Sequence, residues 1–256
     1  MTYLYRFIKN RAFYDEVITE HKLHISDVSY FNDPNEFMTS VVQHHSSLGS
    51  LREALSGGME IDEVSFTVDG QPVDFIDQNE LCQQWNQEHK LHERKYNRVV
   101  CFTKAWDNPF MWKEYADDSR GVAFEFCDLF TGVADTPSFH HGAVSYEPIQ
   151  IDLLGKDLGD YQKLTDALFV KEKKFQEEDE YRCIVYVNEL TKTYYLEFQP
   201  EKLSAVYLGY NMPAGEKKRV LELVERNNPQ AKVYDVKRNK TNFTRSIVSG
   251  YNGTMN

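Results

Sequence analysis

Three charged side chains stand at alternate positions where an apolar segment begins. The segment 177–187 reads EEDEYRCIVYV and carries Glu178, Glu180 and Arg182 at every second position. Because side chains alternate between the two faces of a strand, these three are expected to point the same way. Two carboxylates beside a guanidinium are either an ion cluster that holds a sheet edge together or the edge of an active site.

Two further features have side chains suited to binding. Arg6 interrupts the apolar and aromatic segment TYLYRF, and an inward-pointing guanidinium on such a strand needs an anionic partner. The alternative is that Arg6 faces solvent. Trp112 and Tyr115 are three residues apart in a predicted helix, so they share a face. That face is either part of the core or a platform on which a flat ring stacks.

The segment FNDPNEF at 31–37 offers two more carboxylates, Asp33 and Glu36. They are three residues apart after a turn, a spacing that can bind a hard cation. The interpretation we favour is that Asn32 and Asp33 close the turn and cap the following helix at its N-terminus. Histidines and cysteines are not grouped at metal-ligand spacing, so the sequence predicts no metal site.

Bulk composition excludes several classes of protein. The chain has 256 residues and a formal net charge of −11, which repels nucleic acids and anionic membranes. No apolar segment is long enough to span a membrane, and no secretory signal is recognisable, so we expect a cytoplasmic protein. The sequence also lacks a phosphate-binding loop, a Gly-x-Gly-x-x-Gly fingerprint and a Gly-x-Ser-x-Gly motif.

Alternating and helical patterns follow one another along the chain without repeats or linkers. The fold class they predict is α+β: a single domain over 1–256 with a mixed, largely antiparallel sheet flanked by helices. Strands are expected at 2–7, 23–28, 97–105, 121–126, 141–148, 181–187, 193–198, 203–209 and 231–239, and helices at 10–22, 78–95, 108–118, 161–175 and 214–228. A hairpin is expected at 64–76, around the turn dipeptide Asp69-Gly70.

An ordered set of motifs covers nearly the whole chain: LYRF, FNDPNEF, VVCFTKAWDNPFMWKEYADDSRGVAFEF, VSYEP, KKFQEEDEYRCIVY and LSAVYLGYNM. The set resembles an uncharacterised bacterial family of domains of unknown function. The chain differs from the family pattern at Phe175, where Trp is common, and at Thr103, where the family has Ser. The region 50–95 lies outside the pattern, and we expect it to be an insertion with a hairpin and a helix.

A looser resemblance concerns mono-ADP-ribosyltransferases. These enzymes have a split sheet, with an Arg or His on the first strand, a hydroxyl or aromatic element in the middle and a Glu, often as Glu-x-Glu, at the start of a late strand. The resemblance implies that the sheet is split, that NAD is the substrate and that Glu180 is the catalytic carboxylate assisted by Glu178. It implies a cofactor-binding set of Arg6, Ser26, Asn32, Trp112, Tyr115 and Arg182.

Three functions therefore stay open at this point. The leading hypothesis is an NAD-dependent ADP-ribosyltransferase, a toxin or antiphage defence effector with an unknown protein or nucleic-acid acceptor and with an antitoxin or a phage-derived partner. The second is a metal-dependent nuclease or phosphodiesterase that uses Asp33, Glu36, Glu178 and Glu180. The third is a non-catalytic sensing or interaction module.

Overall fold

The computed structural model describes residues 1–28, 31, 37, 40–41, 67–68, 71–72, 87–88, 90–151, 160–239 and 242–248. The chain divides into two compact units. Unit 1 comprises Met1–Tyr30, Tyr96–Val144 and Lys174–Asn256, and unit 2 comprises Phe31–Lys95 and Ser145–Lys173. Unit 1 holds the large sheet and all the side chains discussed below.

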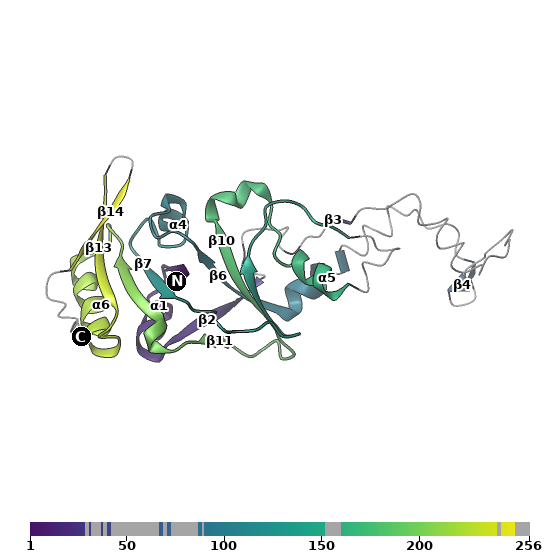
Figure 1. Ribbon diagram of the computed structural model, residues 1–256, viewed down its shortest axis with the longest axis horizontal. Coiled ribbons are helices and arrows are strands. Elements are labelled where there is room, and N and C mark those ends of the chain that lie inside the picture. The colour runs from purple at the N-terminus through teal and green to yellow at the C-terminus, as the bar shows by residue number, and fades with distance from the viewer. Residues whose placement is uncertain are drawn as a thin grey trace. The chain divides into compact units, whose positions relative to one another are not determined.

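The elements of unit 1 are strands with a few helices between them (Figure 1). The strands are β1 (Tyr3–Ile8), β2 (Lys22–Asp27), β6 (Asn97–Thr103), β7 (Val122–Cys127), β8 (Phe139–Ala143), β10 (Glu180–Tyr186), β11 (Tyr194–Glu197), β12 (Leu203–Leu208), β13 (Lys232–Arg238) and β14 (Phe243–Ile247). The helices are α1 (Arg11–Glu20), α4 (Pro109–Glu114), α6 (Ala214–Asn227) and two short 3-10 helices, η3 (Lys173–Glu178) and η4 (Pro200–Lys202).

Unit 2 contributes short elements among the described residues. They are β3 (Ser40–Val41), β4 (Thr67–Val68), β5 (Gln71–Pro72), β9 (Gln150–Ile151) and α5 (Tyr161–Ala167). β3 pairs with β9 in parallel, and β4 pairs with β5 in antiparallel orientation.

The large sheet has ten strands and is mixed. One path through it runs β11-β2-β6-β1-β7-β12-β13-β14, while β10 pairs with β6 and β8 off this path. Only β12 and β13 pair in parallel among these strands, because α6 connects them and returns the chain to the same end of the sheet. The other pairings are antiparallel, as the sequence predicts.

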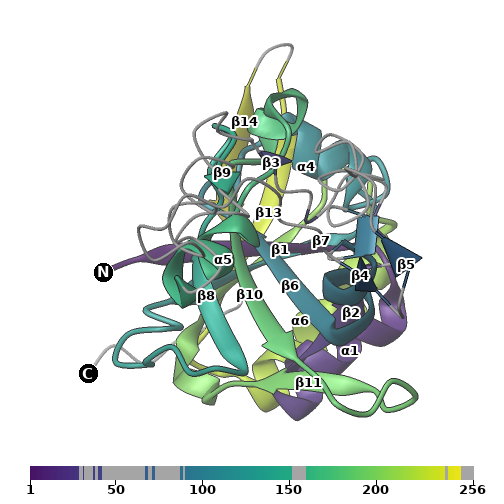
Figure 2. The same cartoon turned by 90° about the vertical axis from the view of Figure 1, so that its right-hand side faces the viewer.

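The sheet branches at β6. Along one edge, Asn97–Thr103 pairs over its full length with Glu180–Tyr186 of β10 (Figure 2). Along the other edge, β6 pairs with β2 near Val99 and with β1 at Thr103. Two strands therefore share one edge of β6, and the sheet splits there into an arm through β1 and β7 and an arm through β2 and β11.

The two faces of the sheet bury different clusters. Along β1, Leu4 and Ile8 belong to a cluster that α1 and α6 cover, whereas Tyr5 and Phe7 belong to a second cluster that includes Trp112 of α4. This alternation is the period-two pattern of a strand buried on both sides. We call these two sides the α1/α6 face and the α4 face.

Local sequence determines where α4 begins. The Asn108 side chain accepts hydrogen bonds from the backbone N–H groups of Phe110 and Met111, at 3.0 and 3.3 Å. Pro109 occupies the first helical position, where a missing N–H costs nothing. A cap followed by proline therefore fixes the start of the helix that covers the α4 face.

A tight turn follows α4. Asp117, Asp118 and Ser119 have φ values of 50°, 50° and 65°, in the left-handed region that short polar side chains tolerate best. The turn packs against Gly209 at the end of β12: a Cβ added to Gly209 would lie 2.1 Å from the carbonyl oxygen of Ser119. Position 209 therefore requires glycine, because the backbone of Ser119 lies where any other side chain would begin.

The α+β class and the mixed, largely antiparallel sheet are confirmed. The helix predicted at 161–175 is shorter, since α5 ends at Ala167 and a 3-10 helix precedes β10. Strand β14 is an element that the sequence patterns did not predict. Most of the region 50–95 lies outside the described residues, so the insertion and the single-domain boundary stay predictions.

A pair of glycine substitutions tests the packing of the turn. Gly209→Ala forces a methyl group into the Ser119 backbone and should lower the free energy of unfolding by about 3 kcal/mol. Gly215→Ala places its methyl group on α6, where nothing lies within 4 Å, and should raise it by about 0.5 kcal/mol. Denaturant titration of both variants measures the contrast, and equal effects would contradict the packing described.

Candidate functional site

A buried ion pair lies at the start of β10. The Arg182 guanidinium donates from Nε and from one terminal nitrogen to the two carboxylate oxygens of Glu180, at 2.9 and 3.0 Å. Glu180 is 2% exposed and Arg182 is fully buried. Two parallel charge-assisted hydrogen bonds fix both side chains, and the alternation of β10 explains why they meet on one face.

Glu178 reaches a different partner. It is the last residue of η3, and Asp179 after it has a φ of 42°, so the strand alternation begins only at Glu180. The buried Glu178 carboxylate accepts a hydrogen bond of 2.8 Å from the hydroxyl of Tyr115, which follows α4. The predicted common face is therefore confirmed for Glu180 and Arg182, whereas Glu178 lies before the strand and bonds to Tyr115.

Two more contacts hold the chain at and after η3 against the segment between β6 and α4. The Asn108 amide donates to the backbone oxygen of Glu177 at 2.6 Å, and the Lys104 ammonium contacts the Asp179 carboxylate at 2.9 Å. Asn108, the N-cap residue of α4, thus also bonds to the segment that carries Glu178 and Glu180. These contacts explain how residues more than 60 positions apart, such as Tyr115 and Glu178, keep a fixed geometry.

Thr103 lies directly opposite Glu180, on β6. Residues opposite each other in antiparallel strands have Cβ atoms about 5 Å apart on the same face. The Thr103 side chain is fully buried, and within the part of the chain that the structure describes its hydroxyl has no hydrogen-bond partner. A buried hydroxyl in this state normally has a water or a bound molecule as partner. We call Thr103, Tyr115, Glu178, Glu180 and Arg182 the acid cluster.

Arg6 does not lie on the side of the sheet that carries the acid cluster. Tyr5 pairs with Thr103 and shares its face, so the next residue, Arg6, points to the α1/α6 face. Its guanidinium donates a hydrogen bond of 2.7 Å to the backbone oxygen of Cys101, at the edge where β1 and β2 diverge from β6. In this position Arg6 satisfies a backbone acceptor at the split of the sheet.

The remaining sequence-based candidates are spread out. Ser26 pairs with Val99, four positions along β6 from Thr103. Trp112 is 1% exposed, donates from its indole nitrogen to the Trp106 oxygen at 2.7 Å and is part of the core on the α4 face. Asn32, like Asp33 and Glu36 of the alternative metal site, lies outside the described residues.

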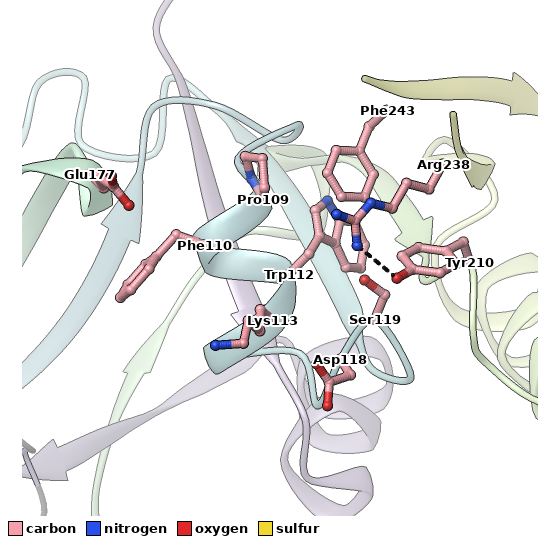
Figure 3. A pocket seen from close by; sticks show the side chains of 10 residues that line it. All are labelled: Pro109, Phe110, Trp112, Lys113, Asp118, Ser119, Glu177, Tyr210, Arg238 and Phe243. Carbon is pink, nitrogen blue, oxygen red and sulfur yellow. Dashed lines mark hydrogen bonds between the residues drawn. The ribbon is translucent and has the colours of Figure 1, made fainter. Parts of the chain in front are cut away.

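A cavity of about 220 Å³ lies against α4. Figure 3 shows Trp112, Phe243, Arg238 and Tyr210 on one side of the helix, with Phe110 and Glu177 on the other. Within the described residues the Arg238 guanidinium has no carboxylate partner. It donates to the Tyr210 hydroxyl at 3.2 Å and lies 5.7 Å from the centre of the Phe243 ring. Aromatic rings with a cation beside them suit a flat, anionic ligand.

Sequence reasoning found the carboxylates and missed several of their neighbours. Thr103 was noted only as a departure from a family pattern, although its place at the end of a buried strand could have suggested a partner for Glu180. The basic residues of 217–245, Arg238 among them, indicate either a solvated surface or, less favoured, a patch for a phosphate-bearing partner. The contact of Arg238 with Phe243 could not be predicted, because β14 carries only a weak strand pattern.

No protein-family model, curated protein or solved structure matches the chain. Among the described residues, no group of three or more metal-ligating side chains is present, and no helix is long and apolar enough to cross a membrane. The metal-dependent and non-catalytic alternatives stay predictions.

A double-mutant cycle tests whether Glu180 and Arg182 act as one unit. Glu180→Gln and Arg182→Met each remove one charge of the buried pair and keep the other in the core, so each should cost about 3–5 kcal/mol of unfolding free energy. The double variant should cost much less than the sum, because neither charge remains.

The exposed pair Lys104 and Asp179 gives a matched control. Their side chains are 46% and 52% exposed, so Lys104→Met and Asp179→Asn should each change stability by less than about 1 kcal/mol. Additive losses in the Glu180 and Arg182 cycle, measured by denaturant titration, would show that the buried pair is not the coupled unit described here.

Proposed function

We propose that the protein binds NAD and transfers its ADP-ribose group to an acceptor, with the acid cluster at the reacting end. The observation that carries this proposal is two buried carboxylates close together in the chain where β10 begins. Glu180 is bonded to Arg182 and lies opposite Thr103, and Glu178 is bonded to Tyr115.

The chemistry needs carboxylates in such a place. When the bond between nicotinamide and ribose breaks, its electron pair leaves with nicotinamide, and positive charge develops on the ribose carbon. A fixed carboxylate next to that carbon stabilises the charge. The acceptor then forms a bond to the carbon and gives up a proton, which a second carboxylate can take.

The geometry suggests a division of roles. Glu180 is oriented by the two hydrogen bonds of Arg182, so it is the carboxylate with the more rigid position, as stabilising a developing charge requires. Glu178 is the partner that orients the acceptor or takes its proton, and Tyr115 positions it. The Thr103 hydroxyl is a hydrogen-bond partner for a ribose hydroxyl.

The cavity against α4 supports a dinucleotide rather than a simple sugar. Its rings offer stacking surfaces for a base, and Arg238 offers a guanidinium for a pyrophosphate. Arg238 therefore takes the role that the sequence suggested for Arg6. The cavity and the acid cluster border the same two helices. Phe110 of α4 and Glu177 of η3 line the cavity, and Tyr115, which follows α4, bonds to Glu178 of η3 in the cluster.

Glu178→Gln is the variant that separates chemistry from folding. Glutamine retains an acceptor for the Tyr115 hydroxyl but removes the charge, so nicotinamide release from NAD should fall about 100-fold or more. The thermal midpoint should change by only a few degrees. Glu180→Gln is less informative, because it leaves the Arg182 charge buried without its partner.

Glu201→Gln serves as the control, since it removes an exposed carboxylate on η4. It should release nicotinamide at the rate of the unmodified protein. The proposal fails if the unmodified protein neither binds NAD in calorimetry nor releases nicotinamide, or if Glu178→Gln releases it as fast as the control. The identity of the acceptor and a role as toxin or defence effector remain part of the proposal.

A further inference from the structure

A second carboxylate, Glu125 of β7, gathers three hydroxyl groups on the α4 face. One of its oxygens accepts from the hydroxyls of Tyr5 and Tyr207, at 3.0 and 2.6 Å, and the other accepts from Ser204 at 2.7 Å. Burial raises the pKa of the Tyr207 hydroxyl well above its ordinary value, so this group stays a donor. The Glu125 carboxylate is thus held in place by neutral donors, and its negative charge still calls for a cation.

Aromatic rings surround this carboxylate. Trp106 stacks on Tyr207 with ring centres 5.3 Å apart, and Tyr207 stacks on Tyr234 at 5.0 Å. Tyr5 meets the edge of Tyr207 at 6.0 Å. We call Tyr5, Trp106, Tyr207, Tyr234 and Glu125 the aromatic cage. Stacked rings beside a carboxylate are the kind of surface that recognises an organic cation.

The chain supplies a cation of its own to this cage. The central carbon of the Arg245 guanidinium lies 4.6, 5.1 and 5.3 Å from the ring centres of Tyr234, Trp106 and Tyr207. All three distances are within the range of a cation–π interaction. The guanidinium also donates to the Tyr207 hydroxyl and lies 3.7 Å from the Glu125 carboxylate.

The cage and its occupant come from different parts of the sheet. The cage residues lie on β1, β7, β12 and β13 and on the loop before α4, and Tyr207 is fully buried. Arg245 lies on β14, the last strand on its path through the sheet, where the residues beyond Phe243 are exposed. Its side chain is 37% exposed, and its ion pair with Glu125 is longer than a direct hydrogen bond.

The geometry points to a binding site for an arginine side chain of a partner polypeptide, with Arg245 as an occupant that such a partner displaces. Three hydroxyl groups hold the Glu125 carboxylate without help from Arg245, so displacement of the Arg245 side chain alone would leave these three hydrogen bonds in place. A guanidinium suits it better than an ammonium, because a flat fork can lie against the rings while it donates to Tyr207 and Glu125. This site is independent of the proposed NAD chemistry.

Arg245→Ala empties the cage and allows a direct test with methylguanidinium as the probe. At a concentration ten times its dissociation constant, methylguanidinium should raise the thermal midpoint of this variant by about 3 °C. Methylammonium at equal ionic strength should raise it far less. The unmodified protein and the control Lys237→Ala, which keeps Arg245 in place, should respond to neither probe.

Two further variants make the test specific. Arg245→Met retains the apolar stem of the side chain and replaces the alanine variant if that variant does not fold. The double variant Arg245→Ala with Glu125→Gln should lose the response to methylguanidinium. Calorimetry with the blocked peptide Gly-Arg-Gly should show binding to Arg245→Ala at least about tenfold tighter than to the unmodified protein, since the internal competitor is gone.

The inference is overturned if folded Arg245→Ala or Arg245→Met shows no response to methylguanidinium, or an equal response to methylammonium. It is also overturned if the Glu125→Gln double variant still responds, or if the peptide binds the unmodified protein and Arg245→Ala alike. NAD binding is measured on the same samples, so a failure of the cage and a failure of the NAD proposal are distinguishable.

Discussion

The pairing of β6 with three strands is the constraint on which the rest of unit 1 depends. A strand has two hydrogen-bonding edges, and β10 takes the whole of one. β1 and β2 must therefore share the other, and they diverge between their short pairings with it. Backbone groups at such a divergence need other partners, and the Arg6 guanidinium supplies one to Cys101. The Arg6 side chain, which the sequence suggests as a ligand-binding group, is therefore used to bond a backbone oxygen at the split of the sheet.

The same pairing aligns polar residues across the α4 face. Glu180 lies opposite Thr103, Thr103 opposite Tyr5, and Tyr5 opposite Glu125, so one row crosses four neighbouring strands. On a sheet covered on both sides, such a row is costly unless its members bond to one another. Within the row, the Tyr5 hydroxyl donates to Glu125. Each carboxylate also has an arginine from outside the row, Arg182 beside Glu180 and Arg245 beside Glu125. The row thus connects the acid cluster with the aromatic cage.

Strand alternation could be predicted from the sequence because it is local. It placed Glu180 and Arg182 together correctly, but it failed for Glu178, since the left-handed Asp179 interrupts the alternation one residue earlier. The convergence of Tyr115 on Glu178 depends on the packing of α4 against η3, a contact between residues 63 positions apart that no periodicity encodes.

The position of Arg6 also depends on contacts between distant parts of the chain. Its strand was predicted, yet its face depends on register with β6, which the sequence does not give. The contribution of β14 was also out of reach, because exposed residues such as Thr244 and Ser246 leave no apolar pattern on that strand. What could be predicted was the order of elements and the acidic motif; what could not was which distant side chains complete each site.

Arg182, Arg238 and Arg245 lie on the α4 face and differ in how strongly their guanidinium groups are bound. This difference suggests different roles for them. Arg182 is fully buried with two direct bonds to Glu180, so removing it would leave a charge in the core. Arg245 and Arg238 lie on the β13–β14 hairpin and keep contact with solvent, held by rings and tyrosine hydroxyls. A guanidinium that keeps part of its hydration exchanges partners at low cost, whereas a buried pair does not. The positive charges that can exchange partners are therefore concentrated on the hairpin. The fixed charge of Arg182 lies at the start of β10, where it keeps the orientation of Glu180, the carboxylate that we propose to be catalytic, constant.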